Sequence, residues 1–241
     1  MILSPRERLI VALDVSSASA AQQIVADVSD SAFAYKVGMQ LFTAEGPRVV
    51  RELVTSGRCV FLDLKYHDIP TTVAAAVREA ASLGVSMLTV HASGGGTMLR
   101  AATEAGNGVN PSLLVLAVTV LTSMDDGDLE KIGVPARAVD QVLRLAALAL
   151  NSGCRGIVAS PREAPQLRKE LGSEFEIVTP GVRSTGIAHG DQQRVATPAQ
   201  AIAAGATRIV VGRPITAAKD PAAEAQSILE QIASVATLQP A

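Results

Sequence analysis

The chain has 241 residues, of which 48% are hydrophobic and 2% aromatic, and its formal net charge is −2. A composition this apolar can form a large aliphatic core and excludes a disordered chain. The near-neutral charge and the lack of a Lys/Arg-rich run argue against nucleic acid or an acidic membrane as a partner. The chain has few aromatic residues and no Trp, so it offers few side chains on which nucleic-acid bases could stack.

The N-terminal segment lacks the pattern of a signal peptide, because its apolar run at residues 9–13 ends at the charged Asp14. No stretch of the sequence approaches the roughly 20 uncharged apolar residues that a transmembrane helix needs. The two cysteines, Cys59 and Cys154, fit a reduced compartment better than a disulfide-bonded fold. We therefore expect a cytoplasmic protein without a membrane segment.

Short runs rich in Val, Ile and Leu recur along the chain and predict strands. Most of them are almost continuously apolar, which is typical of parallel strands that are covered on both faces. Eight such runs occur, at residues 9–13, 34–37, 59–62, 86–90, 113–118, 156–158, 176–178 and 208–211.

Helical patterns alternate with these strands, for example at residues 18–28, 47–56, 72–83, 97–105, 138–152, 164–171 and 197–204. Each strand–helix unit has about 30 residues, the size of a repeat in a (β/α)₈ barrel. The competing fold, an open doubly wound sheet, normally carries Gly-x-Gly-x-x-Gly after its first strand, where this chain has Asp14-Val15-Ser16-Ser17. The sequence thus predicts an α/β protein with a single (β/α)₈ TIM barrel over residues 1–241.

Functional residues of such barrels gather where the strands end at their carboxyl side. The polar or turn-forming residues expected there are Asp14, Lys36, Asp63, Lys65, His91, Ser93, Thr122, Ser123, Ser160, Pro180, Gly181, Arg183, Gly212 and Arg213.

The third strand is followed by an acid–base–acid cluster. Side chains two residues apart on a strand share a face, so Asp63 and Lys65, expected just after the apolar run, should point the same way. Asp68 lies beyond the strand, and Pro70 opens the next helix. The cluster has two interpretations: a structural ion pair, or a lysine that carboxylates hold protonated for use as a proton donor.

The last two strands are followed by glycine and arginine, in Pro180-Gly181-Val182-Arg183 and in Gly212-Arg213. Glycine lets backbone N–H groups approach a ligand, and a guanidinium group matches phosphate oxygens. Because these loops are the usual phosphate site of the fold, we expect a phosphate site here. The polar segment 183–194 suits a mobile lid, from which Gln192 could reach a bound ligand.

The three histidines, His67, His91 and His189, do not have the spacing of metal ligands, so we expect no metal site. His91 fits a hydrogen-bonded residue at a strand end better than a catalyst.

The segment Asp63-Leu-Lys65-Tyr-His-Asp68-Ile-Pro resembles the signature Asp-x-Lys-x-x-Asp-Ile-Pro of the orotidine 5′-phosphate decarboxylase family. The resemblance extends along the chain, through Leu13-Asp14, Tyr35-Lys36-Val37-Gly38, Leu121-Thr122-Ser123, Pro180-Gly181-Val182-Arg183, Asp191-Gln192-Gln193-Arg194 and Val211-Gly212-Arg213.

This resemblance implies a cofactor-free homodimeric barrel that converts orotidine 5′-monophosphate to UMP. Lys65 would protonate C6 while Asp63 faces the departing carboxylate. Lys36 would bridge Asp63 and the ribose, and Asp14 would hold a ribose hydroxyl. Asp68 and Thr72 would come from the neighbouring subunit. The further substrate-binding residues would be Ile69, Thr122 or Ser123 at the pyrimidine, Pro180, and Arg183, Gln192, Gly212 and Arg213 around the phosphate.

Two other functions are compatible with parts of the sequence. A sugar-phosphate decarboxylase or synthase of the same superfamily shares Asp-x-Lys-x-x-Asp and uses Mg²⁺, but its motif typically continues with Gly or Thr-Gly instead of Ile-Pro. A non-catalytic phosphate-binding barrel would have little reason to keep Lys36, Asp63, Lys65 and Asp68 together. The sequence favours the decarboxylase.

Overall fold

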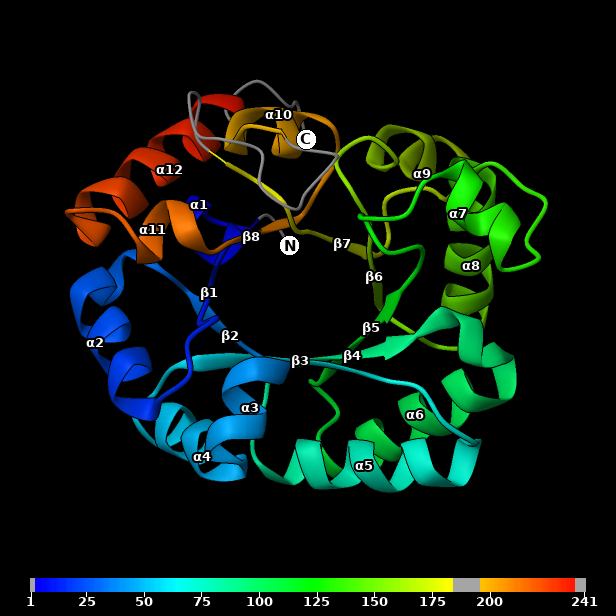
Figure 1. Cartoon of the computed structure of the whole chain (residues 1–241), viewed down its shortest axis with the longest axis horizontal. Coiled ribbons are helices and arrows are strands. Elements are labelled where there is room, and N and C mark those ends of the chain that lie inside the picture. Colours follow the sequence, from blue (N-terminus) through cyan, green and yellow to red (C-terminus); the bar gives the residue numbers. More distant parts are fainter. Residues whose placement is uncertain (1–2, 184–195, 237–241) are drawn as a thin grey trace.

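The computed structural model describes residues 3–183 and 196–236. Its eight strands are parallel, follow one another around the ring in sequence order and close between the last and the first (Figure 1). The predicted TIM barrel is thereby confirmed. The strands are β1 (Leu9–Ala12), β2 (Ala34–Gly38), β3 (Cys59–Tyr66), β4 (Met87–His91), β5 (Leu114–Val118), β6 (Gly156–Val158), β7 (Glu176–Thr179) and β8 (Arg208–Val211).

Helices surround the barrel (Figure 1). They are α1 (Pro5–Arg8), α2 (Ala18–Val28), α3 (Met39–Glu45), α4 (Pro47–Thr55), α5 (Pro70–Ser82), α6 (Gly95–Val109), α7 (Asp126–Lys131), α8 (Ala138–Asn151), α9 (Ala164–Leu171), α10 (Pro198–Ala203), α11 (Arg213–Thr216) and α12 (Pro221–Ala236), with 3₁₀ turns η1 (Ser29–Ser31) and η2 (Ala92–Gly94). Among the described residues, no helix has the length and apolar character needed to cross a membrane.

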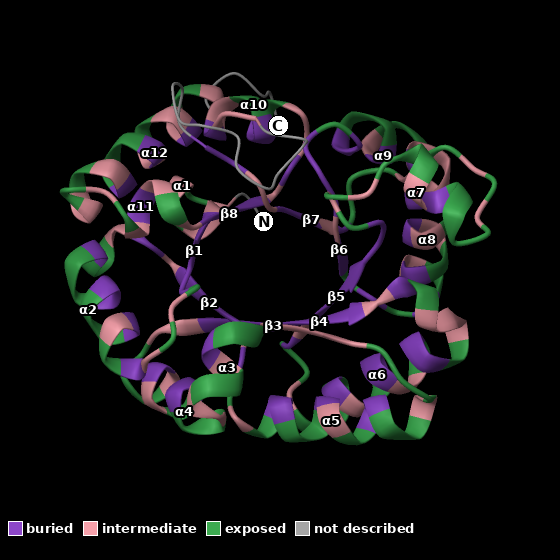
Figure 2. Ribbon diagram, in the orientation of Figure 1, coloured by how far each residue is buried: buried purple, intermediate pink, exposed green. Residues whose placement is uncertain are grey.

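Two apolar layers hold the barrel together. Side chains that point outward from the strands, such as Val11 and Leu88, pack with the buried faces of the helices in one large cluster. Those that point inward, such as Ile10, Phe61 and Met87, form a second cluster inside the ring. Burial on both faces explains why the strands are continuously apolar, and Figure 2 shows the buried strands inside a ring of helices with exposed outer faces.

An ion pair links β7 and β8 at the amino-terminal end of the barrel. The first residues of β7 and β8 supply Glu176 and Arg208, whose Oε2 and Nε lie 3.5 Å apart, and Arg208 also donates a hydrogen bond to the carbonyl of Glu7. A Cβ atom at Gly156 would lie 2.7 Å from the Cβ of Glu176, so only glycine fits beside this pair.

Strand β3 is longer than the sequence indicates. Asp63 and Lys65 were expected after its end, but β3 continues to Tyr66 and includes both. Its pairing with β4 shifts between Leu62 and Tyr66, and Lys65 has the left-handed backbone angle φ 53°. The strand thus continues through an irregular segment, which places both charged side chains at the carboxyl end of the barrel.

Candidate active site

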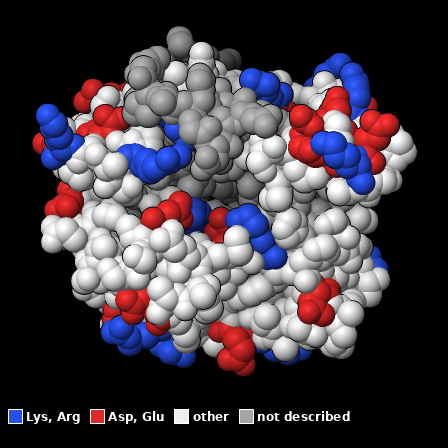
Figure 3. Space-filling model, viewed as in Figure 1, with Lys and Arg blue, Asp and Glu red and all other residues white. Residues whose placement is uncertain are grey.

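A cavity of about 560 Å³ opens at the carboxyl end of the strands. Figure 3 shows a hollow in this face where acidic and basic side chains meet. Most of the predicted site residues line the cavity: Asp14, Lys36, Asp63, Lys65, Thr122, Ser123, Pro180, Gly181, Arg183, Gly212 and Arg213. The structure therefore brings together residues that span almost the whole sequence.

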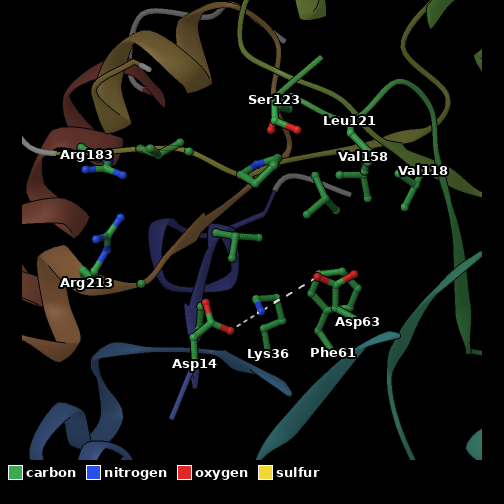
Figure 4. A pocket seen from close by; sticks show the side chains of 18 of the residues that line it. Asp14, Lys36, Phe61, Asp63, Val118, Leu121, Ser123, Val158, Arg183 and Arg213 are labelled. Atoms are coloured by element: carbon green, nitrogen blue, oxygen red, sulfur yellow. Dashed lines mark hydrogen bonds and ion pairs between the residues drawn. The ribbon is translucent and has the colours of Figure 1, made fainter. Parts of the chain in front are cut away.

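Four charged side chains of alternating sign form a chain across one side of the cavity, and Figure 4 labels three of them, Asp14, Lys36 and Asp63. The Nζ atom of Lys36 lies 2.7 Å from Oδ1 of Asp14 and 3.9 Å from Oδ2 of Asp63. The Nζ atom of Lys65 lies 2.8 Å from Oδ1 of the same Asp63. Asp63 therefore lies between two ammonium groups, which compensates its burial as well as theirs.

The strand register explains this arrangement. Ala12 pairs with Lys36 across β1 and β2, and Gly38 pairs with Asp63 across β2 and β3. Asp14 follows β1 directly, so its carboxylate reaches Lys36 from the neighbouring strand. A Cβ atom at Gly38 would lie 2.8 Å from the Nζ of Lys36 and 3.2 Å from Oδ1 of Asp14, so the ion pair occupies space that a side chain here would take.

Burial differs along the chain of charges. Lys36 is 9% exposed as a residue, and the side chain of Asp63 is 14% exposed. The side chain of Asp14 is 58% exposed. The two middle charges, Lys36 and Asp63, are thus the most shielded from water, and charge–charge interactions are strongest there, while Asp14 at one end can meet a polar ligand.

Thr89 of β4 contacts this cluster and was missed by the sequence analysis. Its hydroxyl accepts a hydrogen bond from the backbone N–H of Lys65 at 2.9 Å and donates one to Oδ1 of Asp63 at 2.9 Å. The available signal was weak: a single threonine stands in the apolar run of β4, two residues before His91, and threonine is also a common strand former.

Two arginines lie at the other side of the cavity from Asp63 (Figure 4). Arg183 is buried, and its backbone N–H donates to the carbonyl of Ala196 at 3.0 Å. Gly181, two residues earlier, has φ 76°, a conformation that glycine adopts without strain. Arg213 begins α11 directly after β8. Both cations therefore face the cavity from the ends of the last two strands, as predicted.

The wall between these charged groups is mainly apolar. Val118, Leu121 and Val158 lie near Ser123 in Figure 4. This wall combines apolar side chains with the residues Thr122 and Ser123, whose hydroxyls suit the polar edges of a heterocycle. The predicted phosphate residue Gln192 lies outside the described residues.

Three other predicted residues lie outside the cavity lining, two on the connection from β3 to α5 and one, Thr72, in the first turn of α5. Asp68 is exposed, and its Oδ1 accepts a hydrogen bond from the N–H of Ile69 at 2.6 Å. Ile69 is 64% exposed, and Thr72 is also exposed. None of these three side chains lines the cavity of its own barrel.

His91 at the end of β4 does not line the cavity either. Its ring lies 5.3 Å from that of His67, centroid to centroid. Burial lowers the pKa of His91, and the nearby His67 and Lys65 lower it further, whereas Asp63 opposes them. Across residues 3–183 and 196–236, no three His, Cys, Asp or Glu side chains are grouped so that they could hold a metal ion.

Comparisons with known proteins identify the family. The chain is 53% identical over 227 residues to an orotidine 5′-phosphate decarboxylase of Halorhodospira halophila, with 94% of this chain and 96% of the relative covered. It is 49% identical to one of Idiomarina loihiensis, with 93% and 97% covered. The crystal structure of orotidine 5′-phosphate decarboxylase from Lactobacillus acidophilus superposes with a TM-score of 0.82 at 38% identity, over 94% of this chain and 99% of that one. Residues 7–228 match the Orotidine 5′-phosphate decarboxylase / HUMPS family, and the chain belongs to this family.

Proposed function

We propose that the protein decarboxylates orotidine 5′-monophosphate to UMP, in pyrimidine nucleotide synthesis, without a metal ion or organic cofactor. The observation that carries the proposal is the Lys65 ammonium, held 2.8 Å from Asp63 on the cavity floor, with Arg183 and Arg213 at the other side. A nucleotide has its phosphate at one end and its reacting base at the other, and this cavity offers complementary groups at matching ends. Family membership and the names of the relatives support the same reaction.

The proposed chemistry depends on electrostatics. Loss of carbon dioxide from C6 leaves an electron pair in an sp² orbital that the ring cannot delocalise. A cation already aimed at that carbon stabilises the developing charge and costs no reorganisation during the reaction. Lys65 would supply this charge and then the proton. Asp63 would face the departing carboxylate, and Lys36 would keep Asp63 oriented from its other side.

The rest of the substrate would be held by groups remote from the reacting carbon. Arg183, Gly212 and Arg213 would bind phosphate, together with the predicted Gln192. Asp14 and Lys36 would meet the ribose hydroxyls, and Thr122 or Ser123, with Pro180, would meet the pyrimidine. Binding energy from these contacts can close and dry the site around Lys65.

We also propose that the protein works as a homodimer with shared sites. Asp68, Ile69 and Thr72 are exposed beside the barrel mouth and do not line their own cavity, which fits residues that complete a neighbour's site. A groove between α5 and α6, which includes Ala74 and Ala101, lies on the same side of the molecule. The chain would act as one barrel domain, and its two free cysteines suit the reducing cytoplasm.

An assay with excess EDTA tests the reaction. The protein, treated with EDTA, should consume orotidylate at the same rate as untreated protein and release equimolar UMP and carbon dioxide. Activity that disappears with EDTA and returns with Mg²⁺, or turnover of a 3-keto or hexulose phosphate instead of orotidylate, would favour the Mg²⁺-dependent sugar-phosphate alternative.

A further inference from the structure

We propose that Thr89 is a positioning residue for the reaction: its single hydroxyl fixes the backbone of Lys65 and the carboxylate of Asp63 relative to each other. Thr89 does not line the cavity and so does not touch substrate. The inference rests on the proposed decarboxylation for its kinetic consequences, whereas the hydrogen bonds themselves can be measured without any substrate.

The direction of both hydrogen bonds follows from the atoms involved. A backbone N–H can only donate, so the Thr89 hydroxyl accepts from Lys65 at 2.9 Å. Its own proton is then free for Oδ1 of Asp63, which lies at 2.9 Å. Thr89 is 0% exposed, so water does not compete for either bond. The hydroxyl therefore acts once as an acceptor and once as a donor.

The irregular pairing of β3 with β4 explains why Lys65 needs this partner. Leu62 pairs with Leu88 and Tyr66 with Val90, so three residues of β3 stand opposite one residue of β4, which is Thr89. The segment thus leaves the regular hydrogen-bonding pattern, and Lys65 adopts φ 53°, a conformation that is unfavourable for a residue with a Cβ. The hydroxyl of Thr89 supplies the acceptor that the strand ladder does not give to the N–H of Lys65.

The same hydroxyl also sets the rotation of Asp63. Oδ1 receives both the Thr89 hydroxyl and the Lys65 ammonium, at 2.9 and 2.8 Å, which leaves Oδ2 facing Lys36 at 3.9 Å. Without the hydroxyl, the carboxylate can rotate and the left-handed turn at Lys65 can relax. Either movement displaces the ammonium from the reacting carbon. The phosphate-binding arginines, at the other side of the cavity, would not move.

The test compares three variants. Thr89→Val keeps the shape and removes the hydroxyl, Thr89→Ser keeps the hydroxyl, and Thr103→Val is the matched control. Thr103 is a buried threonine of α6 whose hydroxyl donates to the carbonyls of Arg100 and Ser152, away from the cavity.

Thr89→Val should lower kcat at least about 30-fold with KM for orotidylate within about threefold, because a misplaced catalytic group affects the transition state most. Thr89→Ser should recover kcat to within about threefold of wild type, and Thr103→Val should leave kcat unchanged.

A second readout needs no catalysis. Amide hydrogen exchange at Lys65, in the free protein, should be faster in Thr89→Val than in wild type and should stay slow in Thr89→Ser and Thr103→Val. If Thr89→Val does not fold, Thr89→Ala can be compared with wild type in its place. Alanine also lacks the hydroxyl, and it leaves empty the space that the second methyl group of valine would fill. If wild type fails to consume orotidylate, the proposed function is wrong, and the exchange data still decide whether the Thr89 hydroxyl holds the backbone of Lys65.

Three results would overturn the positioning role. One is Thr89→Val with wild-type kcat, and another is unchanged protection of the Lys65 amide in that variant. The third is a Thr89→Ser protein as slow as Thr89→Val, since loss of packing and not of the hydroxyl would then explain the defect.

Discussion

Lys36 depends on a glycine of its own strand for its position. A methyl group at Gly38 would come within 2.8 Å of the Lys36 ammonium, which is the movable end of a flexible side chain. Gly38→Ala should therefore displace Lys36 from Asp14 and Asp63 while it changes the fold little. We expect kcat/KM for orotidylate to fall at least about tenfold, with the free energy of unfolding within about 1 kcal/mol of wild type.

Gly108→Ala is the control for that substitution, because no atom lies within 4 Å of a Cβ atom at this position of α6. It should leave kcat/KM unchanged. Wild-type kinetics in Gly38→Ala would show that the space beside Lys36 is not needed for the ion pair.

Arg213 is expected to act through binding. Arg213→Ala removes a charge-assisted contact to the substrate phosphate, so KM should rise roughly 100-fold, and added guanidinium should restore part of the loss. Arg144→Ala, which removes an exposed arginine of α8 outside the cavity, should have no effect. An unchanged KM for Arg213→Ala would remove this residue from the phosphate site.

At the residue level, the sequence predicted the charged residues of the cavity lining, because charged residues and glycines after apolar strands are conspicuous. Thr89 could not be found in this way. Threonine fits an apolar strand without any functional reason, and its two hydrogen bonds depend on the irregular pairing of β3 with β4. The close approach of Lys36 to Gly38 is likewise a product of the three-dimensional structure.

At the level of elements, all eight strands were predicted, most with boundaries within one or two residues, because strands buried on both faces leave a strong apolar signal. The end of β3 was the exception. We expected the strand to end before Asp63, because charged residues interrupt the apolar run there. The strand nevertheless continues to Tyr66, because charged side chains at the carboxyl end of the barrel can face the cavity. The hydrophobic pattern of the sequence does not predict the left-handed backbone conformation of Lys65.

The pKa of His91, at the end of β4, predicts how stability depends on pH. Burial first, and then His67 and Lys65, lower this pKa below the ordinary value of 6.5. Below pH 6.5 the unfolded state therefore binds a proton at this position that the folded state binds less readily. The free energy of unfolding should fall as the pH drops through this range, with no contribution from His91 above it.

Urea titration of wild type and His91→Gln at pH 7.5 and 5.5 measures this effect. The variant should lose less stability between the two pH values than wild type, since it has no imidazole to titrate at this position. Equal losses would mean that the His91 pKa is the same in both states.

At the scale of the whole molecule, the two ends of the barrel differ. Arg208 and Glu176 pair at the amino-terminal end, whereas polar side chains at the carboxyl ends of the strands line the cavity. The gathering of polar residues at the carboxyl end could be predicted once the eight-fold repeat was recognised, because functional residues of such barrels lie there. The dimer interface cannot be predicted in the same way, because the sequence of one chain does not show which exposed surface packs against a second copy.

Complementation tests the proposed shared site. In a dimer of one Lys65→Ala chain and one Asp68→Ala chain, one site would be doubly damaged and the other intact. Random co-assembly makes about half of the dimers mixed, so about a quarter of all sites should regain wild-type activity although each parent is nearly inactive. Mixed dimers, isolated by two different tags, that show no recovery would place Asp68 in its own subunit's site.

Lys65→Ala provides the most direct test of the account, which assigns to this side chain both the charge that faces the carbanion and the proton that it receives. The measurement is kcat for orotidylate, together with the affinity for UMP by titration. We predict that kcat falls at least about 10⁴-fold while UMP still binds through the phosphate and ribose contacts. A Lys65→Ala protein that keeps a tenth of the wild-type turnover would contradict the assigned role.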